Sequence, residues 1–299
     1  MIFDRATGLV VDNLAWVDRS ALWMFDLASQ SERWVTSRIS FVGMRDGREG
    51  FFLLRDGRSV ESPISIRHAS APETERASVR YRGNAAEFSG DPALWRFVDT
   101  AVILLYDGEQ RLFRVDAIGR RLIELDLAWY RNGAYDLGYQ GLVDCLSLPE
   151  EDRVIVSVQR SSKLVVIDIE RDCPASWINL AGRGGNPNLA MRTNTDFLAS
   201  DYDTPCRVDV ASLTMVRSER LQDTGQFIGD YQLLPDGTCL VARPFSGDVL
   251  VVNSEDFAVL GRAEVGGQPL RVCAVSEDRV VTRDGKTGKP TVAKLVLAG

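Results

Sequence analysis

The sequence predicts an all-β fold, a seven-bladed β-propeller of four-stranded antiparallel blades, on three observations. Paired apolar strands recur every 40 to 45 residues, short polar turns separate them, and no 10–15-residue amphipathic helical segment lies between them. The length agrees, because seven blades of about 42 residues need roughly 294 residues and the chain has 299. We therefore expect residues 1–299 to form a single propeller domain.

The first repeated element is clearest in KLVVIDIERD (residues 163–172), an apolar strand that ends at an acidic residue and is followed by a polar turn. The equivalent strand ends elsewhere also carry Asp or Asn: Asp26, Asp116, Asp168, Asp209 and Asn253. The steps between them are 90, 52, 41 and 44 residues. Since the first step is about twice the last two, one further copy is expected near residue 71, with 59–67 as its nearest, degenerate candidate. Another is expected near residue 295.

The second repeated element is a pair of short strands joined by a polar turn, as in YQLLPDGTCLVA (residues 231–242). The turn aspartates are 44, 40 and 42 residues apart: Asp152, Asp196, Asp236 and Asp278. Pro-Asp-Gly suits such a turn, because proline presets φ and glycine tolerates positive φ. The last blade stops after its third strand. We expect the N-terminal MIFDR (residues 1–5) to supply the missing outer strand, close the ring and remove an exposed edge.

The run VLVVNSEDFAVLGRAEVGGQPLRVCAVSEDRVVTRD (residues 249–284) resembles a YVTN-type repeat, as found in YncE-like seven-bladed propellers. VVIDIERDCPASWINLAGRGGNPNLAMRTNTDFLASD (residues 165–201) fits the same pattern. The Tyr-Val-Thr-Asn tetrapeptide is absent, and VTRD (residues 281–284) is its nearest equivalent. The resemblance covers roughly residues 140–299 well and 1–140 loosely. It implies the fold, while such repeats are shared by binding proteins, structural proteins and some enzymes.

Composition excludes several classes of function. The net charge is −7 and no run of Lys or Arg occurs, so binding to nucleic acid or to an anionic membrane is not expected. No apolar run approaches the roughly 18–20 residues that span a bilayer, and Asp4 and Arg5 stand where a signal peptide would be apolar. We therefore expect a cytoplasmic protein. The five cysteines form no CxxC pair, and the only histidine, His68, is expected in an exposed loop.

Candidate ligand-binding residues lie in the turns between the second and third strands of the blades, which meet on one face of a propeller. Arginine or tyrosine stands at or near the corresponding position of each: Arg55, Tyr106, Arg160, Tyr202, Arg243 and Arg283. An arginine fork suits carboxylate or phosphate, and tyrosine offers an apolar face with a hydroxyl. A ring that binds an anion is one interpretation. The other is ordinary turn chemistry, because Arg-Asp-Gly and Tyr-Asp-Gly are common turn sequences.

An insertion also stands out. The step of 52 residues is about 10 longer than the repeat, and the excess falls in residues 127–144, which contain Trp129 and Tyr135. Aromatic side chains of this kind concentrate in binding hot spots. The segment is interpreted either as a lid or recognition element, or as a plug that covers the channel mouth.

Two functions follow. The first is a non-catalytic propeller, with no cofactor, that binds a small anionic ligand or a protein partner on its loop face. The alternative is a propeller enzyme, either an acid–base isomerase or cyclase using Asp201, Tyr202 and Asp203, or a lactonase-like metal-dependent hydrolase. The likeness of such a hydrolase to the regucalcin/gluconolactonase group implies oxygen ligands for a divalent metal, for which the candidates are Asp201, Asp203, Asn188 and Asp230. Converging carboxylates favour the enzyme, and an exposed aromatic patch favours the binding protein.

Overall fold

The structure is a computed structural model of the 299-residue chain. It describes residues 1–14, 21–34, 39–42, 50–56, 62–82, 85–97, 102–105, 111–127, 142–148, 152–171, 173–180, 184–185, 187–221 and 227–297. Tyr106, Trp129 and Tyr135 lie outside the described residues. The chain divides into two compact units, Met1–Asn132 and Gly133–Gly299, and each is described by itself.

The first unit contains three antiparallel sheets. One has four strands, β1 (Ile2–Asp4), β2 (Leu9–Leu14), β3 (Ala21–Asp26) and β4 (Ser31–Trp34). The next has five strands, β5 (Ile39–Val42), β6 (Phe51–Asp56), β7 (Ile64–His68), β8 (Ala77–Arg82) and β9 (Ala85–Gly90). After the short helix α1 (Pro92–Phe97), the third has three strands, β10 (Val102–Leu105), β11 (Arg111–Asp116) and β12 (Arg121–Leu125).

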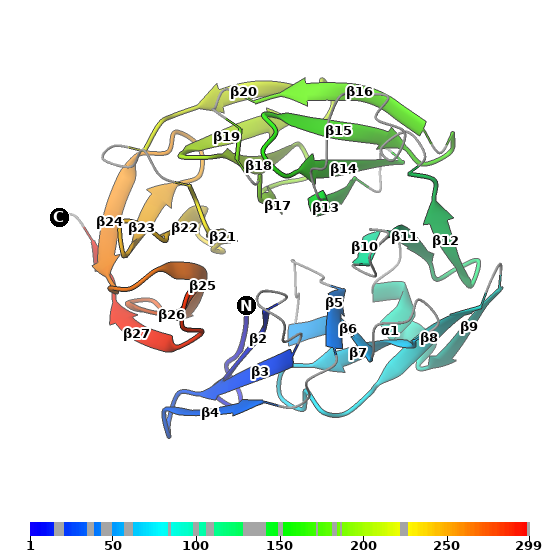
Figure 1. The fold of residues 1–299 in the computed structure, drawn as a ribbon, viewed down its shortest axis with the longest axis horizontal. Coiled ribbons are helices and arrows are strands. Elements are labelled where there is room, and N and C mark those ends of the chain that lie inside the picture. The colour runs from blue at the N-terminus through cyan, green and yellow to red at the C-terminus, as the bar shows by residue number, and fades with distance from the viewer. Residues whose placement is uncertain are drawn as a thin grey trace. The chain divides into compact units, whose positions relative to one another are not determined.

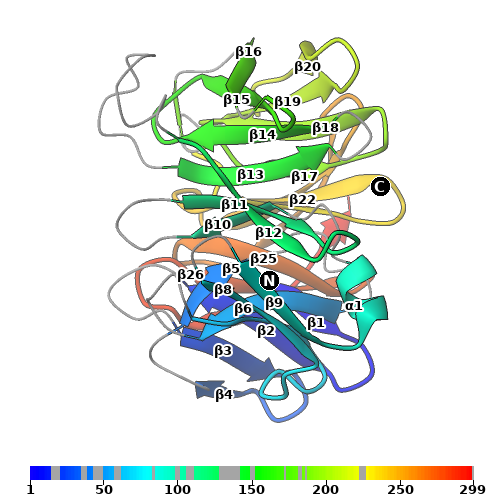
Figure 2. The same ribbon diagram turned by 90° about the vertical axis from the view of Figure 1, so that its right-hand side faces the viewer.

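The second unit contains four antiparallel sheets, whose strands lie side by side in chain order (Figures 1 and 2). Two have four strands: β13 (Leu142–Leu148), β14 (Arg153–Val158), β15 (Lys163–Asp168) and β16 (Cys173–Asn179), then β17 (Leu189–Met191), β18 (Asp196–Asp201), β19 (Thr204–Asp209) and β20 (Thr214–Ser218). A five-stranded sheet contains β21 (Asp230–Leu233), β22 (Thr238–Arg243), β23 (Asp248–Asn253), β24 (Val259–Glu264) and β28 (Val296–Leu297). The last contains β25 (Pro269–Ser276), β26 (Arg279–Asp284) and β27 (Pro290–Lys294).

The cores lie between the faces of neighbouring sheets within each unit. Ile155 of β14 and Val166 of β15 are fully buried and pack with Phe197 of β18 and Val208 of β19 from the next sheet. Because both faces of these middle strands are covered, they are continuous aliphatic runs rather than alternating ones. Burying each such side chain stabilises the fold by about 1.5–3 kcal/mol.

The repeated acidic strand ends are confirmed as structural. They close the third strands β3, β11, β15, β19 and β23, and each side-chain oxygen accepts a backbone N–H from the following turn. The distances include 3.0 Å from Arg171 to Asp168 and 2.7 Å from Ser212 to Asp209. The degenerate copy near residue 71 is also a third strand, β7, although His68, expected in a loop, is its last residue and is half-buried against Phe51.

Within the described residues the sheet of β25–β27 has three strands, as predicted, but the prediction that residues 1–5 complete it is not confirmed. β1 instead pairs with β2, with Ile2 opposite Val11, and is the first strand of its own sheet. The buried N-terminal ammonium lies 3.7 Å from the Asp12 carboxylate, which fixes β1 there.

The chain beyond β27 turns instead to the preceding sheet, where β28 pairs with β24. Gly261 of β24 permits this pairing. A Cβ at that position would lie 2.6 Å from the carbonyl oxygen of Val296, so only glycine lets the two backbones approach so closely. Within the described residues, no helix is long and apolar enough to cross a bilayer.

Candidate binding surface

In the second unit, three turns between the second and third strands of a sheet touch the loop that leads into the next sheet. Ser161 forms an isolated β-bridge with Gly185. The carbonyl oxygen of Tyr202 accepts the Ile228 N–H at 2.7 Å. In the next pair, the Gly247 carbonyl oxygen accepts a bond from Gly266, at 2.8 Å. The turns between second and third strands (residues 159–162, 202–203, 244–247 and 285–289) and the loops that lead into the sheets (184–185, 187–188, 227–229 and 265–268) are together called the turn face.

The crossing between the first two of these sheets depends on two glycines of GRGGNP (residues 182–187). Gly184 has φ +77°, which favours glycine. A Cβ on Gly185 would lie 2.6 Å from the backbone nitrogen of Tyr202. The Gly184 N–H donates at 2.9 Å to Oδ1 of Asp201. Glycine is therefore needed at these positions because the loop passes very close to the turn at Asp201 and Tyr202.

Two of the predicted ring arginines, Arg243 and Arg283, are buried beneath their own turns. Arg243 forms a two-pronged ion pair with Asp248, in which Nε donates to Oδ1 at 2.7 Å and Nη2 bonds to Oδ2. Nε of Arg283 donates to the carbonyl oxygen of Gly288 at 3.1 Å. Both side chains therefore hold the turn that follows each strand, and their contact with a ligand stays a prediction.

Arg55 is the next-to-last residue of β6 in the first unit, and its side chain is 0 % exposed. Arg283 is likewise next to last in β26, whereas Arg243 is the last residue of β22. Arg55 is therefore buried at the end of its strand, and its contact with a ligand stays a prediction.

Arg160 and Tyr202 do reach the turn face. Arg160 is exposed and Tyr202 is half-buried, and both have positive φ, +57° and +59°. This region costs a non-glycine residue about 1–2 kcal/mol, so bonds elsewhere in the turns hold the backbone there. Both residues pack against the Gly184–Gly185 crossing, since the Arg160 carbonyl oxygen would lie 3.0 Å from a Cβ on Gly184. The backbones of both residues therefore lie against the same glycine crossing.

The carboxylates of the enzyme alternative are buried and already bonded. Besides the Gly184 bond to Asp201, Oδ1 of Asp203 accepts the Thr204 hydroxyl at 3.0 Å, and Oδ2 accepts Nε of Arg220 at 2.8 Å. These contacts secure the turn and its entry loop.

Asn188 and Asp230 link the first strands of successive sheets. Nδ2 of Asn188 donates to the Gly229 carbonyl oxygen at 3.3 Å, and Oδ2 of Asp230 accepts the Val272 N–H at 3.3 Å. Over the described ranges, no group of three or more His, Cys, Asp or Glu residues is placed to hold a metal ion. Asn188 and Asp230, two of the candidate metal ligands, thus form hydrogen bonds between sheets.

An aromatic pair on the turn face was missed by the sequence analysis. Phe245, in the turn after β22, is 54 % exposed, and Phe227, in the loop before β21, is half-buried. Their rings meet edge to face, with centroids 5.2 Å apart and planes at 82°. Beneath them Pro244 packs so closely on Gly229 that a Cβ there would lie 2.9 Å from its Cγ. The available signal was a phenylalanine in each of two otherwise polar loop segments, RPFSG and TGQF.

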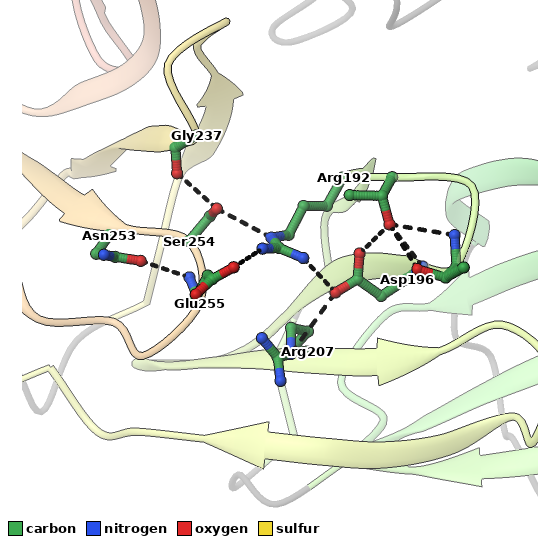
Figure 3. Close-up of polar contacts among 9 residues, drawn as sticks. Arg192, Asp196, Arg207, Gly237, Asn253, Ser254 and Glu255 are labelled. Atoms are coloured by element: carbon green, nitrogen blue, oxygen red, sulfur yellow. Dashed lines mark hydrogen bonds and ion pairs between the residues drawn. The ribbon is translucent and has the colours of Figure 1, made fainter.

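A separate polar cluster joins the sheet of β17–β20 to the next sheet (Figure 3). The guanidinium of Arg192 donates to Asp196 at 2.6 Å, to the Ser254 hydroxyl at 3.0 Å and to Glu255 at 2.8 Å. Arg207 lies 3.6 Å from the same Asp196 carboxylate. Because each nitrogen of Arg192 already donates, the cluster connects two sheets rather than offering a group to a ligand.

No family model matches the chain, and neither does any curated protein sequence. Solved structures do match. The β-propeller domain of Cps50 (Swd1) from Myceliophteria thermophila aligns with a TM-score of 0.64 and 9 % identity over 99 % of this chain and 95 % of that one. The fold is a β-propeller. The WD40 β-propeller domain of Doa1 aligns at 0.62 and 10 % identity, over 97 % and 89 % of the two chains. At such identities the likeness shows the propeller fold alone, so the function of this propeller has to be argued from its turn face.

Proposed function

We propose that this propeller is a non-catalytic binding protein that captures a protein partner on its turn face. The observation that carries the proposal is the pair of Phe227 and Phe245, in which a large aromatic side chain is exposed on a well-held turn. Exposed aromatic side chains are the usual anchors of protein–protein hot spots. A catalytic role for Asp201, Tyr202 and Asp203 has no comparable support, since both carboxylates are buried in structural bonds.

The turn that carries Phe245 is preorganised. The Arg243–Asp248 ion pair spans its base, the Gly247 N–H donates to the Arg243 carbonyl oxygen at 3.0 Å, and Pro244 restricts the backbone. A binding group that is ordered beforehand loses less conformational entropy on association. Arg243, which was predicted to belong to a ligand ring, thus supports binding indirectly, because its ion pair with Asp248 fixes the turn that carries Phe245.

Charge on the turn face indicates the chemistry of the partner. Arg160 and Lys286 are exposed on it, and Arg220, which lies outside the face, pairs with Asp203 of the face while its side chain is 53 % exposed. We infer a partner that inserts an apolar side chain against Phe245 and places acidic residues near these cations. A small anion alone is a weaker fit, because Arg243 and Arg283 are engaged in holding their own turns.

We further propose that residues 1–299 form one seven-bladed propeller of the YVTN-repeat type, with one sheet per blade. The support is the number of sheets in each unit, together with the alignment of nearly the whole chain to single propeller domains. Calorimetry tests this, since one domain should unfold in one transition, and two independent transitions would contradict it. The cytoplasmic location expected from the sequence stays a prediction.

The binding function is tested by photo-crosslinking in cells, with p-benzoylphenylalanine placed at position 245. The control carries it at position 118, where Ile118 is 79 % exposed in the first unit. We expect a discrete partner crosslinked from position 245 and not from 118, and its loss when Arg160 and Lys286 are both changed to Glu. No crosslink at 245, or the same products from both positions, would argue against a binding turn face.

A further inference from the structure

A groove of about 450 Å³ runs along the outer edge of β12 in the first unit. Residues 121–127 line one side of it, and Tyr81 of β8 and Ala86 of β9 line the other. β9 and β12 are the last strands of neighbouring sheets within this unit (Figure 1). The outer groove, as it is called below, therefore follows a strand edge rather than a turn, and it is distinct from the turn face.

The edge that borders the outer groove is open in the described part of the chain. There β12 pairs with β11 only, through a register from Asp116 opposite Arg121 to Leu112 opposite Leu125. The second edge of a strand presents a row of backbone N–H and C=O groups that can pair with another strand. An extended peptide satisfies that row, and peptide-binding domains use such strand addition.

The walls of the outer groove suit a peptide side chain as well as its backbone. Leu122, Leu125 and Leu127 are buried along the β12 side. Tyr81 packs edge to face on Phe113, with ring centroids 5.2 Å apart, so its ring is held in place. Burial raises the pKa of the Tyr81 hydroxyl, which therefore stays neutral and can both donate and accept hydrogen bonds.

The charges lining the outer groove favour a basic ligand. Arg121 donates to Asp116 at 2.8 and 3.0 Å, so its charge is matched by a carboxylate. Glu124 and Asp126 add two further carboxylates to the lining, with Arg111 3.7 Å from Glu124. The net charge of the chain is also negative, −7, which attracts a cationic segment over longer range.

From this combination we propose that the outer groove binds an extended, basic segment of a partner protein as an added strand on β12. One Lys or Arg of the segment lies near Glu124 and Asp126, and an apolar side chain packs between Tyr81 and Leu125. β12 has five residues, so the segment that pairs with it is about 17 Å long. The outer groove does not include residues of the turn face, so the two binding proposals are tested independently.

The test is a selection of phage-displayed random heptapeptides, each with one fixed lysine, against the full chain. Binding of each selected peptide is then measured by fluorescence anisotropy with two matched variants. Ala86→Trp fills the outer groove, whereas Ala85→Trp places the same side chain on the exposed neighbour in β9, which does not line the groove. We expect Ala86→Trp to weaken binding at least tenfold and Ala85→Trp to leave it within twofold.

Glu124→Gln provides a second variant should Ala86→Trp fail to fold, and it should weaken binding three- to tenfold, with a smaller salt dependence. Hydrogen exchange should show that the peptide protects amides of residues 121–127. The proposal is overturned if no peptide is selected, or if binding is equal in all variants. It is also overturned if these amides are already protected without peptide, because another part of this chain then occupies the edge.

Discussion

The rings of Phe227 and Phe245 meet edge to face across two segments of the turn face, 5.2 Å between centroids. One ring comes from the loop that enters the sheet of β21–β24, and the other from the turn between its second and third strands. The half-buried Phe227 supports the exposed Phe245 from one side, and Pro244 fixes the backbone beside it. The pair is therefore a presented apolar group rather than part of the core.

Removal of the exposed ring should separate binding from folding. Phe245→Ala deletes a side chain that is 54 % exposed, so the free energy of unfolding should change by less than about 1 kcal/mol. Urea unfolding monitored by circular dichroism measures this change. Phe113→Ala, at a fully buried position of β11, is the matched control and should cost about 3–5 kcal/mol. A large loss of stability in Phe245→Ala would show that its ring belongs to the core.

The Arg243–Asp248 pair should be a stability determinant. Arg243→Met leaves Asp248 buried with only the half-exposed Arg262 beside it, at 2.7 Å. Breaking a buried pair by removing one partner costs about 3–5 kcal/mol. Thermal and urea unfolding measure the loss. The exposed Arg160, changed to Met as the control, should alter stability by no more than about 0.5 kcal/mol. Equal effects of the two changes would contradict a structural role for Arg243.

Gly261 should control the C-terminal strand alone. In Gly261→Val, the side chain collides with the Val296 carbonyl oxygen, so β28 should separate from β24. Limited proteolysis should then remove the C-terminal residues at least tenfold faster, while the main unfolding transition moves little, since Val296 and Leu297 are exposed. A global loss of stability without faster C-terminal cleavage would contradict this assignment.

Acid should weaken the fold through its turn aspartates. Bonds from the hydroxyl and the backbone N–H of Thr238 hold the pKa of Asp236 below its ordinary value of 3.8, and bonds from Ser212 do the same for the pKa of Asp209. A lowered folded-state pKa stabilises the protein above the unfolded pKa, and that contribution disappears as pH falls through the folded value. The urea midpoint should therefore fall between pH 5 and pH 3.

The same prediction has an internal control. Asp236→Asn and Asp209→Asn together should lower the midpoint at pH 7 and flatten its dependence on pH in this range. An unchanged slope would show that other carboxylates dominate the acid response.

The metal-dependent hydrolase hypothesis predicts that an added cation raises the melting temperature, whereas we expect no such rise. A ligand that binds the folded state raises the melting temperature, because it stabilises that state by RT ln(1 + L/Kd), where L is the concentration of free ligand. Because Asp201, Asp203, Asn188 and Asp230 have separate bonding partners, we expect Ca²⁺, Mn²⁺, Zn²⁺ and EDTA to leave the melting temperature within about 1 °C. A saturable rise with one cation, abolished in Asp203→Asn, would restore the hydrolase hypothesis.

Local patterns in the sequence predicted the strands and turns well. Such features depend on residues only a few positions apart. Examples are the bond from the Arg171 N–H to Asp168 and the turn made by Asp236 and Gly237. The repeat therefore located the third strands, including the degenerate one at β7. The pairing of β28 with β24 of the preceding sheet was not predictable in this way, because it depends on the close approach of two backbones at Gly261.

The candidate site was harder to predict for a physical reason. Arg160 lies in the turn after β14 and Arg243 is the last residue of β22, yet one is exposed and the other is buried against Asp248. That difference depends on whether an acidic residue begins the next strand and on the path of the side chain. The Phe227–Phe245 pair joins residues 18 positions apart on two loops, so their contact follows from the fold and not from any local motif.

The central claim, that Phe245 anchors a protein partner, is tested most directly by the affinity of the crosslinked partner for two purified variants. Biolayer interferometry should show at least a tenfold rise in Kd for Phe245→Ala, as expected of a hot-spot residue worth about 2 kcal/mol. Ile118→Ala, which removes an even more exposed apolar side chain elsewhere, should leave Kd within twofold. Equal affinity of the wild-type protein and Phe245→Ala would contradict the account.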